Sequence, residues 1–146
     1  MRTIRPATPA DAERVMQIWR DAVDATHHFL KPEDRSAIEA ELSTFLPTAP
    51  LWLAVDHQDQ ATGFMLLDDC HMEALFINPR SRGQGVGRAL VDHALRLHDD
   101  RLSTDVNEQN VQAFGFYRHL GFEPVGRSDR DGQGRPYPLI HLRLTR

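Results

Sequence analysis

Residues 72 to 90 of the chain read Met-Glu-Ala-Leu-Phe-Ile-Asn-Pro-Arg-Ser-Arg-Gly-Gln-Gly-Val-Gly-Arg-Ala-Leu. A short apolar run, Leu75-Phe-Ile77, ends at Asn78-Pro79, which predicts a strand followed by a turn. Beyond the turn, apolar residues recur at helical spacing from Val86 onward, so a helix is expected there. The segment therefore predicts a strand, a turn, a glycine loop and a helix.

Three glycines fall within five residues of this loop, at Gly83, Gly85 and Gly87. Because glycine has no side chain, its backbone N–H groups can approach a ligand closely at the start of a helix. A phosphate or pyrophosphate suits such a site. The Gly-Lys-Ser/Thr of a Walker loop is absent, and Arg88 stands where a dinucleotide fingerprint needs its third glycine. Both of those nucleotide motifs are therefore disfavoured.

A different pattern, Arg/Gln-x-x-Gly-x-Gly/Ala, is matched by Arg82, Gly85 and Gly87. A second block follows at residues 110–122, with asparagine, alanine, tyrosine and a Gly-Phe pair in that order. Together the two blocks resemble the GNAT family of acyl-CoA N-acyltransferases. The resemblance spans nearly the whole chain.

Three further segments resemble a small bacterial branch of that family, the YjaB type. They are Ala25-Thr-His-His-Phe-Leu30, Gly63-Phe-Met-Leu-Leu67 and Asn107-Glu-Gln-Asn110. This closer resemblance makes peptidyl lysine the leading candidate for the acetyl acceptor.

Composition agrees with one domain over residues 1–146, since 146 residues with 40% hydrophobic content suffice for one substantial core. No signal peptide and no membrane span is recognised, so a cytoplasmic protein is expected. A net charge of −4 argues against broad nucleic-acid binding. The single cysteine, Cys70, excludes an intramolecular disulfide, and no spacing typical of a metal site is found.

The periodicity predicts a mixed α/β sheet of six or seven strands with about four helices. A meander is expected at its centre, because the connections there are short, and parallel pairing is expected later, where strands alternate with helices. The strands are expected near residues 2–5, 51–55, 63–67, 71–77, 102–106, 122–128 and 140–144. The helices are expected to begin near residues 9, 32, 86 and 111, with Ala12, Val15, Met16, Trp19 and Val23 on the inner face of the first and Ile38, Leu42, Phe45 and Leu46 on that of the second.

The resemblance implies a GNAT fold in which acyl-CoA lies in a V-shaped gap between the splayed fourth and fifth strands. Main-chain groups of Leu75, Phe76 and Ile77 would then pair with the pantetheine arm. The pyrophosphate would lie on the loop formed by Arg82, Gly83, Gln84, Gly85, Val86, Gly87 and Arg88. Asn110 would either bond the pantetheine arm or cap the last helix, and both roles are compatible.

For the chemistry, the resemblance makes Tyr117 the general acid that protonates the departing sulfur. The general base is left open. His71 and Glu73 are two apart on the fourth strand, which predicts a shared face, and either could serve if that face lines the cleft. Water alone or the loop of His27 and His28 are the other possibilities.

The acceptor side is expected at the turn between the first two helices, where His27, His28 and Phe29 are candidate substrate contacts, with Tyr137 on the closing hairpin. Transfer is expected to be direct, in a ternary complex of enzyme, acetyl-CoA and amine. Small amines are the alternative acceptors, and a binding module that senses acetyl-CoA without turnover is the alternative of a different class. Monomer and homodimer both remain open.

Overall fold

The computed structural model describes residues 3–146, and the expected strand position at Arg2 lies outside them. Seven strands form one mixed sheet in the order β1-β2-β3-β4-β5-β7-β6. Their bounds are β1 Thr3–Pro6, β2 Trp52–Val55, β3 Ala61–Asp68, β4 His71–Ile77, β5 Arg101–Asn107, β6 Glu123–Ser128 and β7 Leu139–Thr145. The mixed sheet of six or seven strands predicted from the sequence is confirmed, with seven strands in the described residues.

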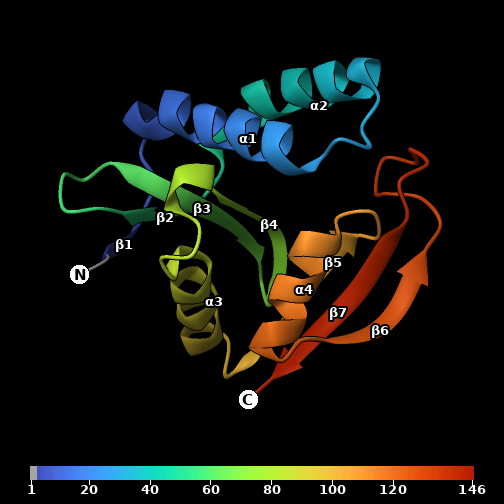
Figure 1. Cartoon of the computed structure of the whole chain (residues 1–146). Helices are drawn as coiled ribbons and strands as arrows, with labels where there is room; N and C mark the ends of the chain where they lie inside the picture. Colours follow the sequence, from blue (N-terminus) through green and yellow to red (C-terminus); the bar gives the residue numbers. More distant parts are fainter. Residues whose placement is uncertain (1–2) are drawn as a thin grey trace.

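Four α-helices and three short 3-10 turns complete the described residues. The helices are α1 Ala12–Thr26, α2 Pro32–Phe45, α3 Val86–Leu97 and α4 Val111–Leu120, and the 3-10 turns are η1 Pro9–Asp11, η2 Leu46–Thr48 and η3 Pro79–Ser81. Figure 1 shows α1 and α2 side by side along one side of the sheet and α3 and α4 on the other. None of the helices in the described residues is long and apolar enough to cross a membrane.

Each face of the sheet has its own core. The predicted inner face of α1 is buried at Val15, Met16, Trp19 and Val23, and it packs on the β2 and β3 side chains Leu53 and Phe64. The opposite face carries Leu90 and Val91 of α3 together with Leu102, Leu120 and Leu142. This division leaves the α1 side of β5, β7 and β6 without a covering helix (Figure 1).

The second helix packs more loosely than its sequence predicted. Ile38 and Leu42 are partly buried against the α1 core, but Phe45 is 49% exposed and Leu46 is buried only after the helix has ended. No residue of α2 is fully buried. The helix rests on one edge of α1, so only part of its apolar stripe finds a partner.

The central strands part soon after they meet. β4 and β5 run parallel, as predicted, but they pair only at His71 with Ser103 and Met72 with Thr104. Beyond these pairs the β4 edge that faces β5 has no strand partner in the described chain. The V-shaped gap expected from the resemblance is therefore present.

A bulge in β4 lies at the point where the gap opens. Against β3, Leu66 pairs with Ala74 and Leu67 pairs with Met72, so Glu73 has no partner. An extra residue in one strand interrupts the alternation of side chains between the two faces. The shared face predicted for His71 and Glu73 depended on that alternation, and the bulge removes its basis.

Candidate active site

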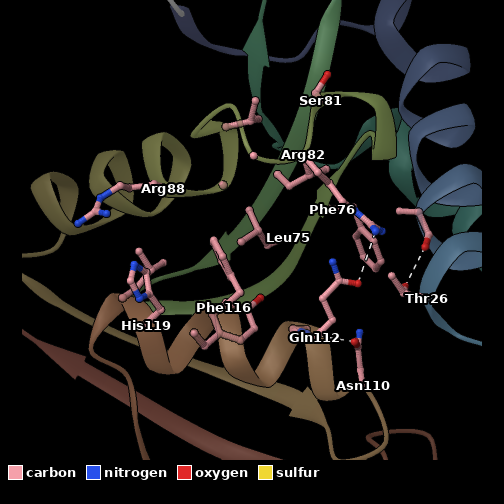
Figure 2. A pocket seen from close by; sticks show the side chains of 18 of the residues that line it. Thr26, Leu75, Phe76, Ser81, Arg82, Arg88, Asn110, Gln112, Phe116 and His119 are labelled. Atoms are coloured by element: carbon pink, nitrogen blue, oxygen red, sulfur yellow. Dashed lines mark hydrogen bonds between the residues drawn. The ribbon is translucent and has the colours of Figure 1, made fainter.

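A cavity of about 500 Å³ opens where β4 and β5 diverge. This volume is in the range of small-molecule binding sites. Its walls come from the C-terminal end of α1, the second half of β4, the glycine loop with the start of α3, and one face of α4 (Figure 2). Segments far apart in the sequence thus meet around one space.

Most of the residues predicted to bind the cofactor line this cavity. They are Leu75, Phe76, Ile77, Arg82, Gly83, Gly85, Val86, Gly87, Arg88 and Asn110. Gln84 is the member of the predicted loop that does not line it. Of the other candidates, Tyr117 and His27 line the cavity, whereas Glu73, His71, His28, Phe29 and Tyr137 do not.

The glycine loop has the backbone that its composition predicted. Gly83 and Gly85 have φ angles of 75° and 80°, a left-handed region that favours glycine, and Gly85 immediately precedes α3. The first N–H groups of a helix have no intrahelical acceptor, and they carry the positive end of the helix dipole. The cavity wall at the start of α3 is therefore suited to an anion.

The two arginines of the loop are placed differently. Arg82 points across the cavity, where its Nη1 donates to Oε1 of Gln112 at 3.4 Å, while Arg88 lies along α3 with its guanidinium directed away from that pair (Figure 2). Gln112 is neutral, so this bond leaves the charge of Arg82 without a carboxylate partner. Arg82 is the arginine better placed to meet a phosphate inside the cavity.

Asn110 uses one of its two polar atoms for the helix. Its Oδ1 accepts from the N–H of Ala113 at 3.1 Å, which caps α4. The side-chain Nδ2 remains as a donor in a residue that lines the cavity. The two roles predicted for Asn110 are thus compatible because they use different atoms.

Tyr117 is 7% exposed and lies on the cavity side of α4. Burial raises the pKa of Tyr117 above its ordinary value. The phenol therefore keeps its proton over the whole physiological pH range. It can act as a hydrogen-bond donor toward negative charge that develops in the cavity.

His71 belongs to a different cluster. Its Nδ1 lies 2.7 Å from the Ser103 hydroxyl and its Nε2 lies 3.4 Å from Asp105 Oδ2, on the sheet face opposite α4. Glu73 is exposed at the bulge. Neither side chain reaches the cavity wall.

Several cavity residues were not predicted from the sequence. Leu120 follows from the position of Tyr117, because a helix places residues three and four apart on one face, and Phe116 lies four residues before Leu120. Ala22 and Thr26 were not site candidates, since only the tertiary fold brings the end of α1 beside β4. The full set of unpredicted lining residues is Ala22, Thr26, Ser81, Gln112, Ala113, Phe116, His119 and Leu120.

The sequence of residues 18–137 matches the model of the acetyltransferase (GNAT) domain. The chain belongs to the GNAT acetyltransferase family. It is accordingly an N-acetyltransferase, as the sequence predicted.

Known GNAT proteins resemble it over almost their full length. The chain is 53% identical to the peptidyl-lysine N-acetyltransferase YjaB of Salmonella typhimurium over 97% of both chains. The solution structure of apo-form YjaB from Escherichia coli superposes with a TM-score of 0.93 at 51% identity, covering 98% of this chain and 97% of that one. The resemblance to the YjaB-type branch is therefore confirmed.

A relative with a different acceptor is more distant. The aminoglycoside N(6')-acetyltransferase type 1 of Stenotrophomonas maltophilia is 32% identical over 86% of this chain and 88% of its own length. This GNAT protein and the YjaB proteins are named for different classes of amine. Family membership alone does not fix the acceptor.

Proposed function

We propose that this GNAT protein transfers the acetyl group of acetyl-CoA directly to a primary amine, and that its acceptor is the lysine side chain of a protein. The observation that carries the proposal is the cavity, which joins an anion-binding loop, an unpaired strand edge and a buried tyrosine. The 53% identity to a peptidyl-lysine N-acetyltransferase supports the choice of lysine.

The cavity fits the three parts of acetyl-CoA in order. The start of α3 and Arg82 offer N–H groups and a positive charge to the pyrophosphate. The β4 edge from Ala74 to Ile77 lacks a strand partner, so its main-chain groups can pair with the pantetheine arm as with an added strand. Asn110 can donate to the same arm through Nδ2.

The reaction exchanges the C–S bond of the thioester for a C–N bond. The lone pair of a neutral amine attacks the thioester carbonyl carbon, a C–N bond forms, and the C–S bond breaks with its electron pair on sulfur. A backbone N–H of β4 would stabilise the oxyanion that forms in between. The nitrogen loses one proton and the sulfur gains one, so the products are an acetamide and CoA thiol.

Tyr117 would stabilise the departing sulfur by a hydrogen bond from its phenol. Because burial raises the pKa of Tyr117, donation of a hydrogen bond is favoured over complete transfer of the proton. Water is the proton acceptor that the proposal uses, since Glu73 and His71 lie outside the cavity wall.

The test is release of CoA thiol from acetyl-CoA in the presence of lysine peptides, N-terminal amine peptides, polyamines and aminoglycosides. Turnover with lysine peptides, with acetylated lysine identified by mass spectrometry, is the expected result. Turnover with aminoglycosides alone would show that the acceptor is a small amine and not a protein lysine. Failure of the protein to bind acetyl-CoA in a calorimeter would overturn the proposal as a whole.

A further inference from the structure

His27 lines the cavity, and it lies outside the two sequence blocks that mark the GNAT family. It follows the last turn of α1, where its N–H bonds to the carbonyl of Val23 at 2.8 Å. Its ring packs beside Phe29 and Phe76, with ring centroids 5.2 and 6.4 Å away. A histidine is thus held between aromatic rings in the cavity that Tyr117 also lines.

The hydrogen bonds around Thr26 fix the tautomer of this ring. The Thr26 hydroxyl donates its single proton to the Ala22 carbonyl, 2.8 Å away, because a carbonyl oxygen can only accept. The same Oγ1 lies 2.7 Å from Nδ1 of His27. Thr26 must therefore accept at that contact, so Nδ1 carries the hydrogen and Nε2 carries a lone pair.

The surroundings keep the ring uncharged. Burial lowers the pKa of His27 to about 4, and the neighbouring His28 adds to the effect. Within residues 3–146, the ring of His27 makes its one side-chain hydrogen bond through Nδ1, and Nε2 has no side-chain partner there. The lone pair on Nε2 is thus available to a donor that enters the cavity.

We propose that Nε2 of His27 accepts an N–H hydrogen bond from the acceptor amine and directs the amine lone pair toward the thioester. This inference rests on the proposed function and names a positioning contact for the same site. Phe76 lines the cavity beside the ring, and this apolar surface fits an amine carried on an aliphatic stem, such as a lysine side chain. His27 binds the nitrogen and is not the final holder of its proton, which passes to water.

The first test reads the tautomer directly in the intact protein. In 15N–1H correlation spectra of the histidine rings at pH 7, His27 should show a protonated Nδ1 and an unprotonated Nε2. Thr26→Val removes the hydroxyl, and the spectrum should then show a mixture of tautomers. A ring with its hydrogen on Nε2 in the wild-type protein would overturn the proposal.

The second test separates contact with the amine from packing. His27→Leu removes the acceptor atom, and we expect kcat/KM for a lysine peptide to fall about tenfold, the size of one neutral hydrogen bond. His27→Gln restores an acceptor oxygen and should recover part of that loss. The dissociation constant of acetyl-CoA, measured by calorimetry, should stay within about twofold in both variants because the lost bond is to the amine.

His57→Gln is the matched control, since His57 is exposed in the β2–β3 turn. It should leave every measured constant unchanged. Equal kcat/KM in wild type and His27→Leu would overturn the proposal while leaving acetyl transfer intact. If kcat/KM fell equally in His27→Leu and His27→Gln and both variants bound acetyl-CoA more weakly, His27 would be a packing residue. That result would also overturn the proposal. Absence of turnover in the wild type would instead count against the proposed function, and the tautomer would still be readable.

Discussion

Asp105 on β5 accepts a hydrogen bond from His141 on β7, with Asp105 Oδ1 2.6 Å from Nδ1 of His141. The other carboxylate oxygen lies 3.4 Å from Nε2 of His71 on β4. One side chain therefore links the strands on both sides of β5, close to where β4 and β5 part. The Ser128 hydroxyl, 2.7 Å from Nε2 of His141, extends this cluster to β6.

Removal of that carboxylate should weaken the sheet without touching the cavity. For Asp105→Ala we expect the free energy of unfolding to fall by about 1 kcal/mol, because the cluster is only partly shielded from water. Urea unfolding at pH 7 measures the change. Asp68→Ala, at the exposed end of β3, is the control and should be neutral. A loss of acetyl-CoA affinity in Asp105→Ala would contradict the assignment of this cluster to the sheet alone.

Replacement of Tyr117 by Phe tests its role in turnover. The variant keeps the ring in its buried place and removes only the hydroxyl that would stabilise the departing sulfur. We expect kcat to fall by about 100-fold or more, the size of the loss of one hydrogen-bond donor to developing negative charge, with little change in the dissociation constant of acetyl-CoA. Release of CoA thiol gives kcat, and calorimetry gives the dissociation constant of acetyl-CoA. A protein that only senses acetyl-CoA would show no turnover in either form.

Two glycines test the shape of the cavity. A Cβ on Gly87 would lie 2.8 Å from Cζ of Phe116, so Gly87→Ala must displace that ring in the cavity wall. A Cβ on Gly115 of α4 would meet open space. We expect Gly87→Ala to weaken acetyl-CoA binding, and Gly115→Ala to leave it unchanged while stabilising the helix by about 0.5–1 kcal/mol. Equal affinity of both variants for acetyl-CoA would show that the Phe116 ring can move aside without changing the binding site.

The sequence was sufficient to predict the strands, the helices and most of the residues that line the cavity, for identifiable reasons. Asn110 and Gly121 are local signals for the start and the end of a helix. Asn110 caps the start of α4 as expected, and Gly121 ends it with a φ angle of 107°. The loop could be predicted because its function depends on consecutive residues. Leu75, Phe76 and Ile77 were placed at the site by the resemblance to the GNAT family, and they line the cavity.

The acceptor side could not be predicted in the same way. Whether Tyr137 faces a substrate or a carboxylate depends on how the hairpin meets α2, and no local pattern encodes that contact. The face of His71 depended on a single bulge residue, Glu73, which periodicity does not reveal. His27 was one of three candidates in its turn, and only the contact with Thr26 distinguishes its ring nitrogens.

Tyr137 joins the last hairpin to the start of α2. Its hydroxyl donates to Asp34 and accepts from the N–H of Lys31 at 3.1 Å, and the residue is 5% exposed. Tyr137→Phe removes both hydrogen bonds at a nearly buried site, while Asp34 keeps Nε of Arg135 at 3.9 Å. We expect a loss of about 1–3 kcal/mol in unfolding free energy. Hydrogen exchange should show faster exchange at Lys31, whereas unchanged exchange there would mean that the bond does not hold the two segments together.

Asp11 makes stability depend on pH at the acid end. Arg5 binds its carboxylate with two N–H groups, at 2.9 and 3.0 Å, and the Thr8 N–H donates to it at 2.8 Å. The bond from Arg5 is the main cause that lowers the pKa of Asp11 from 3.8 to about 2. A carboxyl group whose pKa is lower in the folded state stabilises that state above the unfolded pKa, and the contribution is lost as pH falls through the folded value.

The stabilisation from Asp11 should therefore be complete above about pH 4 and absent below about pH 2. Because solvent screens part of this interaction, we expect Asp11→Asn to cost about 1 kcal/mol at pH 7. Other carboxylates titrate in the same range, so the quantity to measure is the difference in unfolding free energy between wild type and variant at each pH from 7 to 2. That difference should shrink toward zero between pH 4 and pH 2, and a difference that stays constant over this range would show that the ion pair with Arg5 does not control the titration of Asp11.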